Sequence, residues 1–204
     1  EYGDEISSSI YVAFKLDSIP GVFEAAGAGE DASILIWTTT PWTLPANVAV
    51  SLAPDADYVL VQADGKSYIM AEELVEDVAQ VAGWEDVHLL AGSDGEPVRV
   101  KGKQLFGLTY TAPIRHDLTG KVIYGDHVTL DTGTGAVHTA PGHGQDDYRV
   151  GLEFDLPILM PVDDNGVLTD EAGPFAGLEV TEANPKIIQW LQDQGALVAA
   201  KEIN

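Results

Sequence analysis

The sequence predicts a β-rich mixed α/β fold, with a β-barrel-like or curved mixed sheet as its core and a few peripheral helices. Short strand-like apolar runs outnumber amphipathic helical segments, and turn-forming residues separate them at close intervals. Hydrophobic residues make up 45% of the 204-residue chain, which is enough for a folded core. Glycine and proline are spread along the chain, without a linker or a repeat. We therefore expect residues 1–204 to form a single domain.

The first strands are predicted from alternating and continuous apolar runs. Residues 1–8 are mostly polar, and we expect them to be a flexible end. Residues 18–31 contain several glycines and a proline and predict a loop, whereas the apolar run 33–37 predicts a buried strand. Residues 9–16 alternate apolar and polar side chains, which predicts a half-buried strand with an inward face of Ile10, Val12, Phe14 and Leu16.

A hairpin and a helix follow along the chain. Asp64-Gly65 is a strong signal for a tight turn between two strands. Residues 71–81 predict an amphipathic helix, and Gly83 can end it. The strands predicted in this part are residues 47–52, 58–63 and 67–70.

The second half of the chain also predicts both helices and strands. Helices are predicted over residues 146–154 and 185–194, the second followed by Gly195. A turn at Gly125-Asp126 is expected to join two strands. The strands predicted here are residues 97–103, 122–124, 127–130, 136–139 and 197–200.

The charge of the chain is strongly acidic. Ten lysines and arginines face 33 aspartates and glutamates, for a formal net charge of −23. Nucleic-acid binders usually show the opposite balance, because counterion release from phosphates drives their affinity. Acidity of this kind is more typical of a solubility adaptation. Four basic side chains are candidates for a local RNA contact or are scattered surface charges: Arg99, Lys101, Lys103 and Arg115.

Several function classes are excluded by composition. The chain has no cysteine, which excludes disulfides, thiol catalysis and thiolate metal sites and fits a cytoplasmic protein. No apolar run is long enough to cross a membrane, and the first residues do not resemble a signal peptide. Neither a phosphate-binding Gly-Lys-Ser/Thr motif nor a Gly-x-Ser-x-Gly nucleophile motif is present.

Two polar loops carry most of the chemistry. We call residues 38–47 the threonine loop, because it opens with Thr38, Thr39 and Thr40 directly after a predicted strand. In an extended chain alternate side chains share a face, so Thr38 and Thr40 are expected to lie together, with Thr39 opposite. Two hydroxyl groups on one face can orient a water molecule, and Asn47 adds a donor and an acceptor. Taken alone, the segment also fits an ordinary strand and packed turn.

The second loop, residues 133–147, we call the histidine loop. It combines glycines that permit close backbone approach with His138, His143, Asp146 and Asp147. Asp147, near a helix start, can hold a ligand ammonium group. Each residue also has a purely structural explanation: a core histidine, a turn residue or a helix cap. A metal site built from His138, His143 and Asp147 is a further alternative, although no helix sets the spacing of these ligands.

The two loops resemble the signature loops of the connective-peptide editing domain of isoleucyl-tRNA synthetase, a class I aminoacyl-tRNA synthetase. Residues 125–131 are also similar to this family, and the likeness runs from about residue 10 to the end of the chain. Valyl and leucyl relatives carry an arginine at the place of Thr40 and an acidic residue at the place of Trp42. The nucleotide-binding motifs of the parent enzyme are absent from this chain. The resemblance therefore implies an editing domain excised from a larger synthetase, with ATP binding and amino-acid activation left to the parent.

The resemblance implies an aminoacyl-tRNA deacylase that hydrolyses the ester of mischarged Val-tRNA(Ile) after transfer. A synthetic pocket gains only about 1–3 kcal/mol from one methylene, so translation fidelity requires a second sieve. The implied partners are the 3′ end of tRNA(Ile) carrying valine and the rest of the parent synthetase, with no membrane, cofactor or metal. Two alternatives remain open: a non-catalytic module that binds the tRNA 3′ end, and a metal-dependent hydrolase.

The resemblance also implies roles for individual residues. Asp147 would bind the α-ammonium group of the aminoacyl ester. Thr38, Thr39 and Thr40 would position water or the terminal adenosine, and His138 would line the amino-acid pocket and help to exclude isoleucine. The remaining substrate-binding residues would be Trp37, Trp42, Asn47, Gly135, Ala136 and Val137, whereas His143 would be structural.

Overall fold

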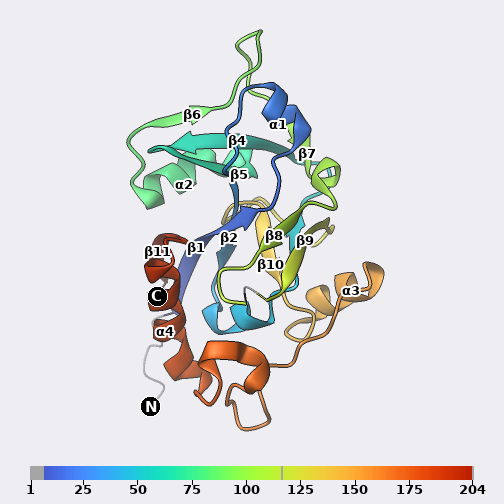
Figure 1. The fold of residues 1–204 in the computed structure, drawn as a ribbon, viewed down its shortest axis with the longest axis vertical. Helices are drawn as coiled ribbons and strands as arrows, with labels where there is room; N and C mark the ends of the chain where they lie inside the picture. The colour runs from blue at the N-terminus through green and yellow to red at the C-terminus, as the bar shows by residue number, and fades with distance from the viewer. Residues whose placement is uncertain (1–6, 116, 204) are drawn as a thin grey trace.

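A computed structural model describes residues 7–115 and 117–203, and its core is a closed barrel of six strands (Figure 1). Pairing of β1 with β2 closes the ring. The barrel is mixed, because β3 pairs with β9, and β10 with β2, in parallel, while the other neighbours are antiparallel. In order around the ring, the strands are β1 (Ser7–Leu16), β8 (Thr109–Thr111), β9 (Thr119–Tyr124), β3 (Ala49–Leu52), β10 (Ala136–Thr139) and β2 (Ser33–Thr38).

Further strands extend the sheet from two edges of the barrel. β5 continues from β2, and β4 pairs with β5, β6 and β7 in the upper part of Figure 1. On the other side, β11 pairs with β1, which brings the two ends of the described chain together. These strands are β4 (Asp57–Ala63), β5 (Lys66–Ala71), β6 (Val87–Leu89), β7 (Val100–Lys101) and β11 (Leu197–Ile203). The predicted barrel-like fold with peripheral helices is confirmed.

Helices are few and lie outside the barrel. The α-helices are α1 (Gly21–Ala25), α2 (Val75–Ala82), α3 (Gln145–Glu153) and α4 (Val180–Asp193). The 3₁₀ segments are η1 (Pro41–Ala46), η2 (Glu72–Leu74), η3 (Gly102–Leu105) and η4 (Asp170–Phe175). None of the helices within residues 7–115 and 117–203 has the length and apolar character needed to cross a membrane.

Strong local signals are confirmed by the structure. Asp64 and Gly65 both have positive φ and connect β4 to β5 as a two-residue hairpin turn. Gly83 adopts the left-handed conformation that ends α2. The predicted inward face of the first strand is buried, with Ile10, Val12, Phe14 and Leu16 all between 0% and 3% exposed.

Four predictions of local structure are wrong in part. The segment 18–31 contains the short helix α1, in which buried Phe23 anchors the turn. Residues 127–130 form no strand, because β9 pairs with β3 and β8 and not with the residues that follow it in the chain. Within 97–103 only β7 pairs with β4, and the 3₁₀ turn η3 follows at once. α4 begins at Val180, five residues before Pro185, because buried Ala183 holds its first turns against the core.

The start of β1 also differs from the expectation for residues 1–8. The structure places Ser7 in β1, paired with Ile203 of β11, so the strand begins two residues earlier than predicted. The rest of the expected flexible end, residues 1–6, lies outside the described residues.

Candidate functional site

The threonine loop and the histidine loop meet at one end of the barrel. β2 and β10 run parallel and pair at Trp37 and Val137, so both chains leave the barrel on the same side. The first continues into η1 and the second into α3 (Figure 1). Between them lies a cavity of about 240 Å³, which we call the loop cavity. Its lining consists of Trp37, Thr38, Thr39, Thr40, Thr43, Val137, His138, Ala140, His143 and Asp147.

A row of threonine hydroxyl groups forms one wall of the loop cavity. The hydroxyl oxygen of Thr38 lies 3.3 Å from that of Thr40 and also accepts the backbone N–H of Thr40 at 3.1 Å. Thr40 in turn lies 3.4 Å from the hydroxyl of Thr43. Thr38 and Thr40 therefore share a face, as predicted from strand alternation. Thr39 and Thr40 are exposed, so their hydroxyl groups are accessible to a ligand or to water.

His138 forms a second wall and is held at both ring nitrogens. Its Nδ1 lies 2.8 Å from Asn47 Nδ2, and its Nε2 lies 2.8 Å from the Thr43 hydroxyl. An amide nitrogen can only donate, so Nδ1 accepts and the neutral ring carries its proton on Nε2. The Thr43 hydroxyl oxygen accepts a hydrogen bond from this Nε2–H, and its own O–H donates to the carbonyl of Thr40. The orientation of Asn47 is set by Tyr110, whose hydroxyl donates to Oδ1, and by its own bond to the carbonyl of Ala49.

The protonation state of His138 follows from its burial. The side chain is 6% exposed, and burial, together with nearby His143, lowers the pKa of His138 to about 3. A neutral ring with both nitrogens engaged is a poor proton acceptor near pH 7. The geometry therefore makes His138 a rigid wall of the cavity rather than a general base.

Asp147 provides the carboxylate of the loop cavity. It lies in the first turn of α3, and its Oδ2 accepts the backbone N–H of Ala140 at 3.0 Å. Within the described residues Oδ1 has no hydrogen-bond partner. Burial raises the pKa of Asp147 above its ordinary value, and the bond from Ala140 opposes this shift. A cationic ligand group that binds Oδ1 would stabilise the ionised form.

Comparison with known sequences identifies a close match over nearly the whole chain. Isoleucine–tRNA ligase of Enterococcus faecalis is 46% identical over 198 residues, which cover 97% of this chain and 20% of the ligase. The enzyme of Moorella thermoacetica is 47% identical over 198 residues, with the same coverage. The enzyme of Desulfovibrio desulfuricans is 46% identical over 205 residues, or all of this chain and 21% of the ligase.

The chain is homologous to a segment of isoleucine–tRNA ligase. It spans about one fifth of the length of the curated relatives it matches. The family resemblance drawn from the two loops is thereby confirmed. No family model matches the chain.

Solved structures support the fold of this isoleucine–tRNA ligase homologue. The crystal structure of GlLeuRS-CP1 superposes with a TM-score of 0.77 at 15% identity, covering 96% of this chain and all of that one. The editing domain of the Plasmodium falciparum cytosolic leucyl-tRNA synthetase superposes with a TM-score of 0.72 at 9% identity, covering 97% and 99%. The homologue thus has the fold of a CP1 editing domain.

Not all predicted site residues of the ligase homologue line the loop cavity. The ring of Trp42 makes an edge-to-face contact with the ring of His143, with centroids 5.1 Å apart. The backbone N–H of Trp42 donates to the side chain of Asn184. Asn47 lies behind His138. Gly135 and Ala136 face the barrel core; a Cβ on Gly135 would meet Ala71 Cβ at 2.6 Å.

Two residues that contribute to the site were not predicted from the sequence. Thr43 completes the hydroxyl row, and its position three residues after Thr40 in a 3₁₀ turn was the available signal. Tyr110 orients Asn47 from β8, a strand that was not predicted. His143 lines the cavity with its Nε2 buried and unpaired among the described residues, and burial lowers its pKa.

The structure also bears on the metal-site alternative and on the four basic residues. Within residues 7–115 and 117–203, no group of three or more histidines and carboxylates is placed to hold a metal ion. The four basic candidates for RNA contact are all engaged with carboxylates: Arg99 with Glu72, Lys101 with Asp57, Lys103 with Asp55 and Arg115 with Asp117.

Proposed function

We propose that this chain is an editing hydrolase domain that cleaves the ester of valine on tRNA(Ile) with a water molecule and without a metal. The observation that carries this proposal is the loop cavity. The carboxylate of Asp147 lines it together with a row of hydroxyl groups and the neutral ring of His138, which is held at both nitrogens. Homology to isoleucine–tRNA ligase and the CP1 fold support the same assignment.

Binding of the aminoacyl end follows from the walls of the cavity. The α-ammonium group of the ester would pair with Asp147 Oδ1, which is the strongest charge-assisted contact available. The valyl side chain would then pack against Val137 and the ring of His138. Because the His138 ring is held at both nitrogens, it would leave less room for isoleucine than for valine, which is the second sieve that editing requires.

Hydrolysis requires an oriented water molecule rather than a strong base. An ammonium group next to the ester makes the carbonyl carbon more electrophilic. The exposed hydroxyl groups of Thr39 and Thr40 would orient the water and donate to the developing oxyanion. Water adds to the carbonyl, the ester C–O bond breaks, and a proton from the water passes to the leaving ribose oxygen. His138 does not accept the proton from the water, because its Nδ1 already accepts a hydrogen bond from Asn47.

Deacylation of Val-tRNA(Ile) and Ile-tRNA(Ile) by this chain, with and without EDTA, tests the proposal. We expect the valyl ester to be hydrolysed faster than both the isoleucyl ester and the uncatalysed control, with or without chelator. Loss of activity in EDTA would establish a metal-dependent hydrolase instead. Binding of the tRNA end without hydrolysis at high protein concentration would establish a non-catalytic module.

A further inference from the structure

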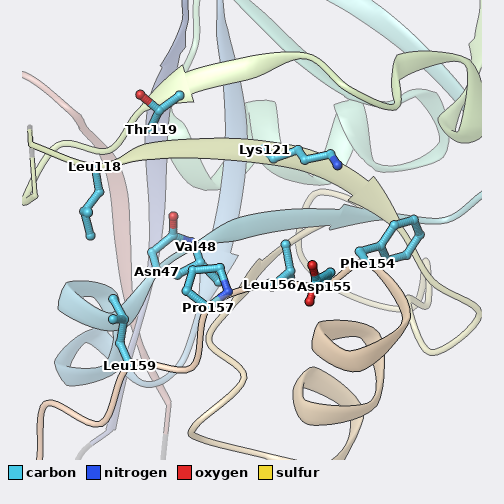
Figure 2. Close-up of a pocket in the computed structure, with 10 residues that line it drawn as sticks. All are labelled: Asn47, Val48, Leu118, Thr119, Lys121, Phe154, Asp155, Leu156, Pro157 and Leu159. Carbon is cyan, nitrogen blue, oxygen red and sulfur yellow. The ribbon is translucent and has the colours of Figure 1, made fainter.

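A second cavity, of about 310 Å³, is lined by Asn47 (Figure 2), whose side chain also bonds to His138 of the loop cavity. It is enclosed by β9, by the segment that leads into β3, and by the chain that follows α3. Its lining consists of Asn47, Val48, Leu118, Thr119, Lys121, Phe154, Asp155, Leu156, Pro157 and Leu159. No residue of this second cavity other than Asn47 takes part in the proposed function.

The floor of the second cavity is apolar. Val48, Phe154, Leu156 and Leu159 belong to a small hydrophobic cluster that is separate from the main core of the barrel. Leu118 closes the cavity from the start of β9 (Figure 2). A volume of about 310 Å³ is at the small end of ligand sites, so the floor fits a short aliphatic group rather than a large ring system.

Two opposite charges lie at the rim of this apolar floor. Lys121 and Asp155 both line the cavity, yet neither forms an ion pair within the described residues. The ammonium group of Lys121 lies 4.8 Å from the ring centroid of Phe106, which supports the side chain without neutralising it. A ligand that carries one negative and one positive group can therefore pair with both.

The backbone at Asp155 fixes where its carboxylate lies. Asp155 has a φ of 54° and ends α3 in the left-handed conformation, in which the N–H of Leu156 donates to the carbonyl of Gly151 at 2.8 Å. Aspartate and asparagine adopt this conformation more readily than most non-glycine residues. The turn that ends α3 therefore holds the Asp155 carboxylate at the cavity.

We propose that the second cavity binds a free aliphatic α-amino acid, with its carboxylate on Lys121, its ammonium group on Asp155 and its side chain on the apolar floor. A phosphate or nucleic acid fits less well, because Asp155 opposes the single lining cation and the chain carries a net charge of −23. A purely apolar ligand would leave both charges unpaired.

Occupancy of the second cavity is coupled to the loop cavity through one side chain. Asn47 lines the second cavity and donates to His138 Nδ1, and His138 lines the loop cavity. A ligand that contacts Asn47 therefore perturbs the group that holds His138. We expect binding to change the NMR signals of the His138 ring without contact between the ligand and that ring.

An NMR titration of this chain with L-leucine tests the site. The largest saturable amide shifts are expected at Leu118, Thr119 and Leu156, with smaller shifts at His138. Isovalerate and isoamylamine, which each carry only one of the two charges, should bind at least about tenfold more weakly than leucine. Equal binding of either compound, or shifts confined to the threonine loop, would overturn the proposal.

Single substitutions test whether Lys121 and Asp155 bind the two charged groups of leucine. Lys121→Met and Asp155→Asn are each expected to weaken leucine binding about tenfold or more, and asparagine tolerates the left-handed backbone. Lys66→Met removes an exposed lysine at the β4–β5 turn and serves as the matched control with unchanged affinity. Retained binding in both cavity variants would refute this site. Because leucine binding and ester hydrolysis are measured separately, either proposal can fail while the other stands.

Discussion

At the scale of single residues, the loop cavity owes its properties to hydrogen bonds that fix protonation states. Asn47 donates to His138 Nδ1, and the Nε2–H of His138 donates to the hydroxyl oxygen of Thr43. Tyr110 and the carbonyl of Ala49 prevent the Asn47 amide from turning over. Asp147, in contrast, has an oxygen without a partner among the described residues, so the carboxylate is the group that can respond to a ligand.

The buried His138 predicts a loss of stability in mild acid. Its pKa is about 3 in the folded chain against 6.5 in the unfolded chain, so the unfolded state binds the extra proton first. The stabilisation is fully present above pH 6.5 and is lost as pH falls towards 3. Between pH 7 and pH 5 the loss is about 2 kcal/mol. Urea unfolding at both pH values should show this loss, and His138→Gln should reduce it, with the part due to half-buried His143 remaining. An unchanged pH dependence in the variant contradicts the account.

Asp147 predicts the sharpest loss of hydrolysis. Asp147→Asn removes the negative partner of the substrate ammonium group and should lower kcat/KM for Val-tRNA(Ile) about 30-fold or more. In the unaltered chain, kcat/KM should fall as acid protonates the carboxylate, at a pH above the ordinary aspartate range because its pKa is raised.

The neighbouring aspartate provides the control for this prediction. Asp146 is exposed and pairs with Arg149 at the surface, so Asp146→Asn should change kcat/KM by no more than about twofold. Similar losses in both variants would assign the effect to the helix terminus rather than to the ammonium contact.

At the scale of elements, the parallel pairing of β2 with β10 brings the two loops together. The antiparallel pair of β8 and β9 contributes Tyr110, which bonds to Asn47 of the threonine loop. Gly120 in β9 lies under the ring of Tyr110, where an added Cβ would be 2.0 Å from Cζ. The hydroxyl of the same tyrosine bonds to Asn47. Glycine at this position therefore allows the contact that orients His138.

Gly120→Ala should be destabilising by about 2 kcal/mol or more, because Tyr110 must leave its position in the core. Hydrolysis should also weaken at temperatures where the variant is still folded, because Asn47 loses its hydroxyl partner. Gly21→Ala is the control, since nothing lies within 4 Å of an added Cβ there, and its stability should change by less than about 0.5 kcal/mol. Urea unfolding of the two variants measures both effects, and equal stability would contradict the packing argument.

Elements also differ in how well local signals predict them. The β4–β5 hairpin and the end of α2 were predicted, because positive φ at a glycine is a local property. The strand expected over 127–130 was wrong and β8 was missed, because the partner of β9 is chosen by barrel closure. Short strands of three residues carry too little periodicity to be recognised.

At the scale of the whole molecule, the net charge of −23 destabilises the folded chain, because its acidic groups repel one another. All three arginines are already paired with carboxylates, which leaves a large acidic excess. This field weakens capture of tRNA by the chain on its own, so the proposed hydrolysis should show a high KM for Val-tRNA(Ile).

The charge predicts stabilisation by salt. Raising NaCl from about 0.01 M to about 1 M shortens the Debye length from about 30 Å to about 3 Å and screens the repulsion. The melting temperature should rise by about 3 °C for each kcal/mol of repulsion removed, as measured by circular dichroism. A variant with glutamine at the exposed Glu30, Glu73 and Glu153 should show a smaller rise. No rise in the unaltered chain would show that its acidic groups are spaced too widely to repel.

The sequence by itself determined the chemistry of the two loops, the strand-rich barrel class and the local turns, because these depend on residue type and on nearby backbone preferences. Only the tertiary structure decided which groups meet. Parallel pairing at Trp37 and Val137 joins loops about a hundred residues apart, and Tyr110 reaches Asn47 from a separate strand. The same packing engages both ring nitrogens of His138 and keeps the ring neutral. Such assignments depend on long-range contacts, which no local pattern encodes.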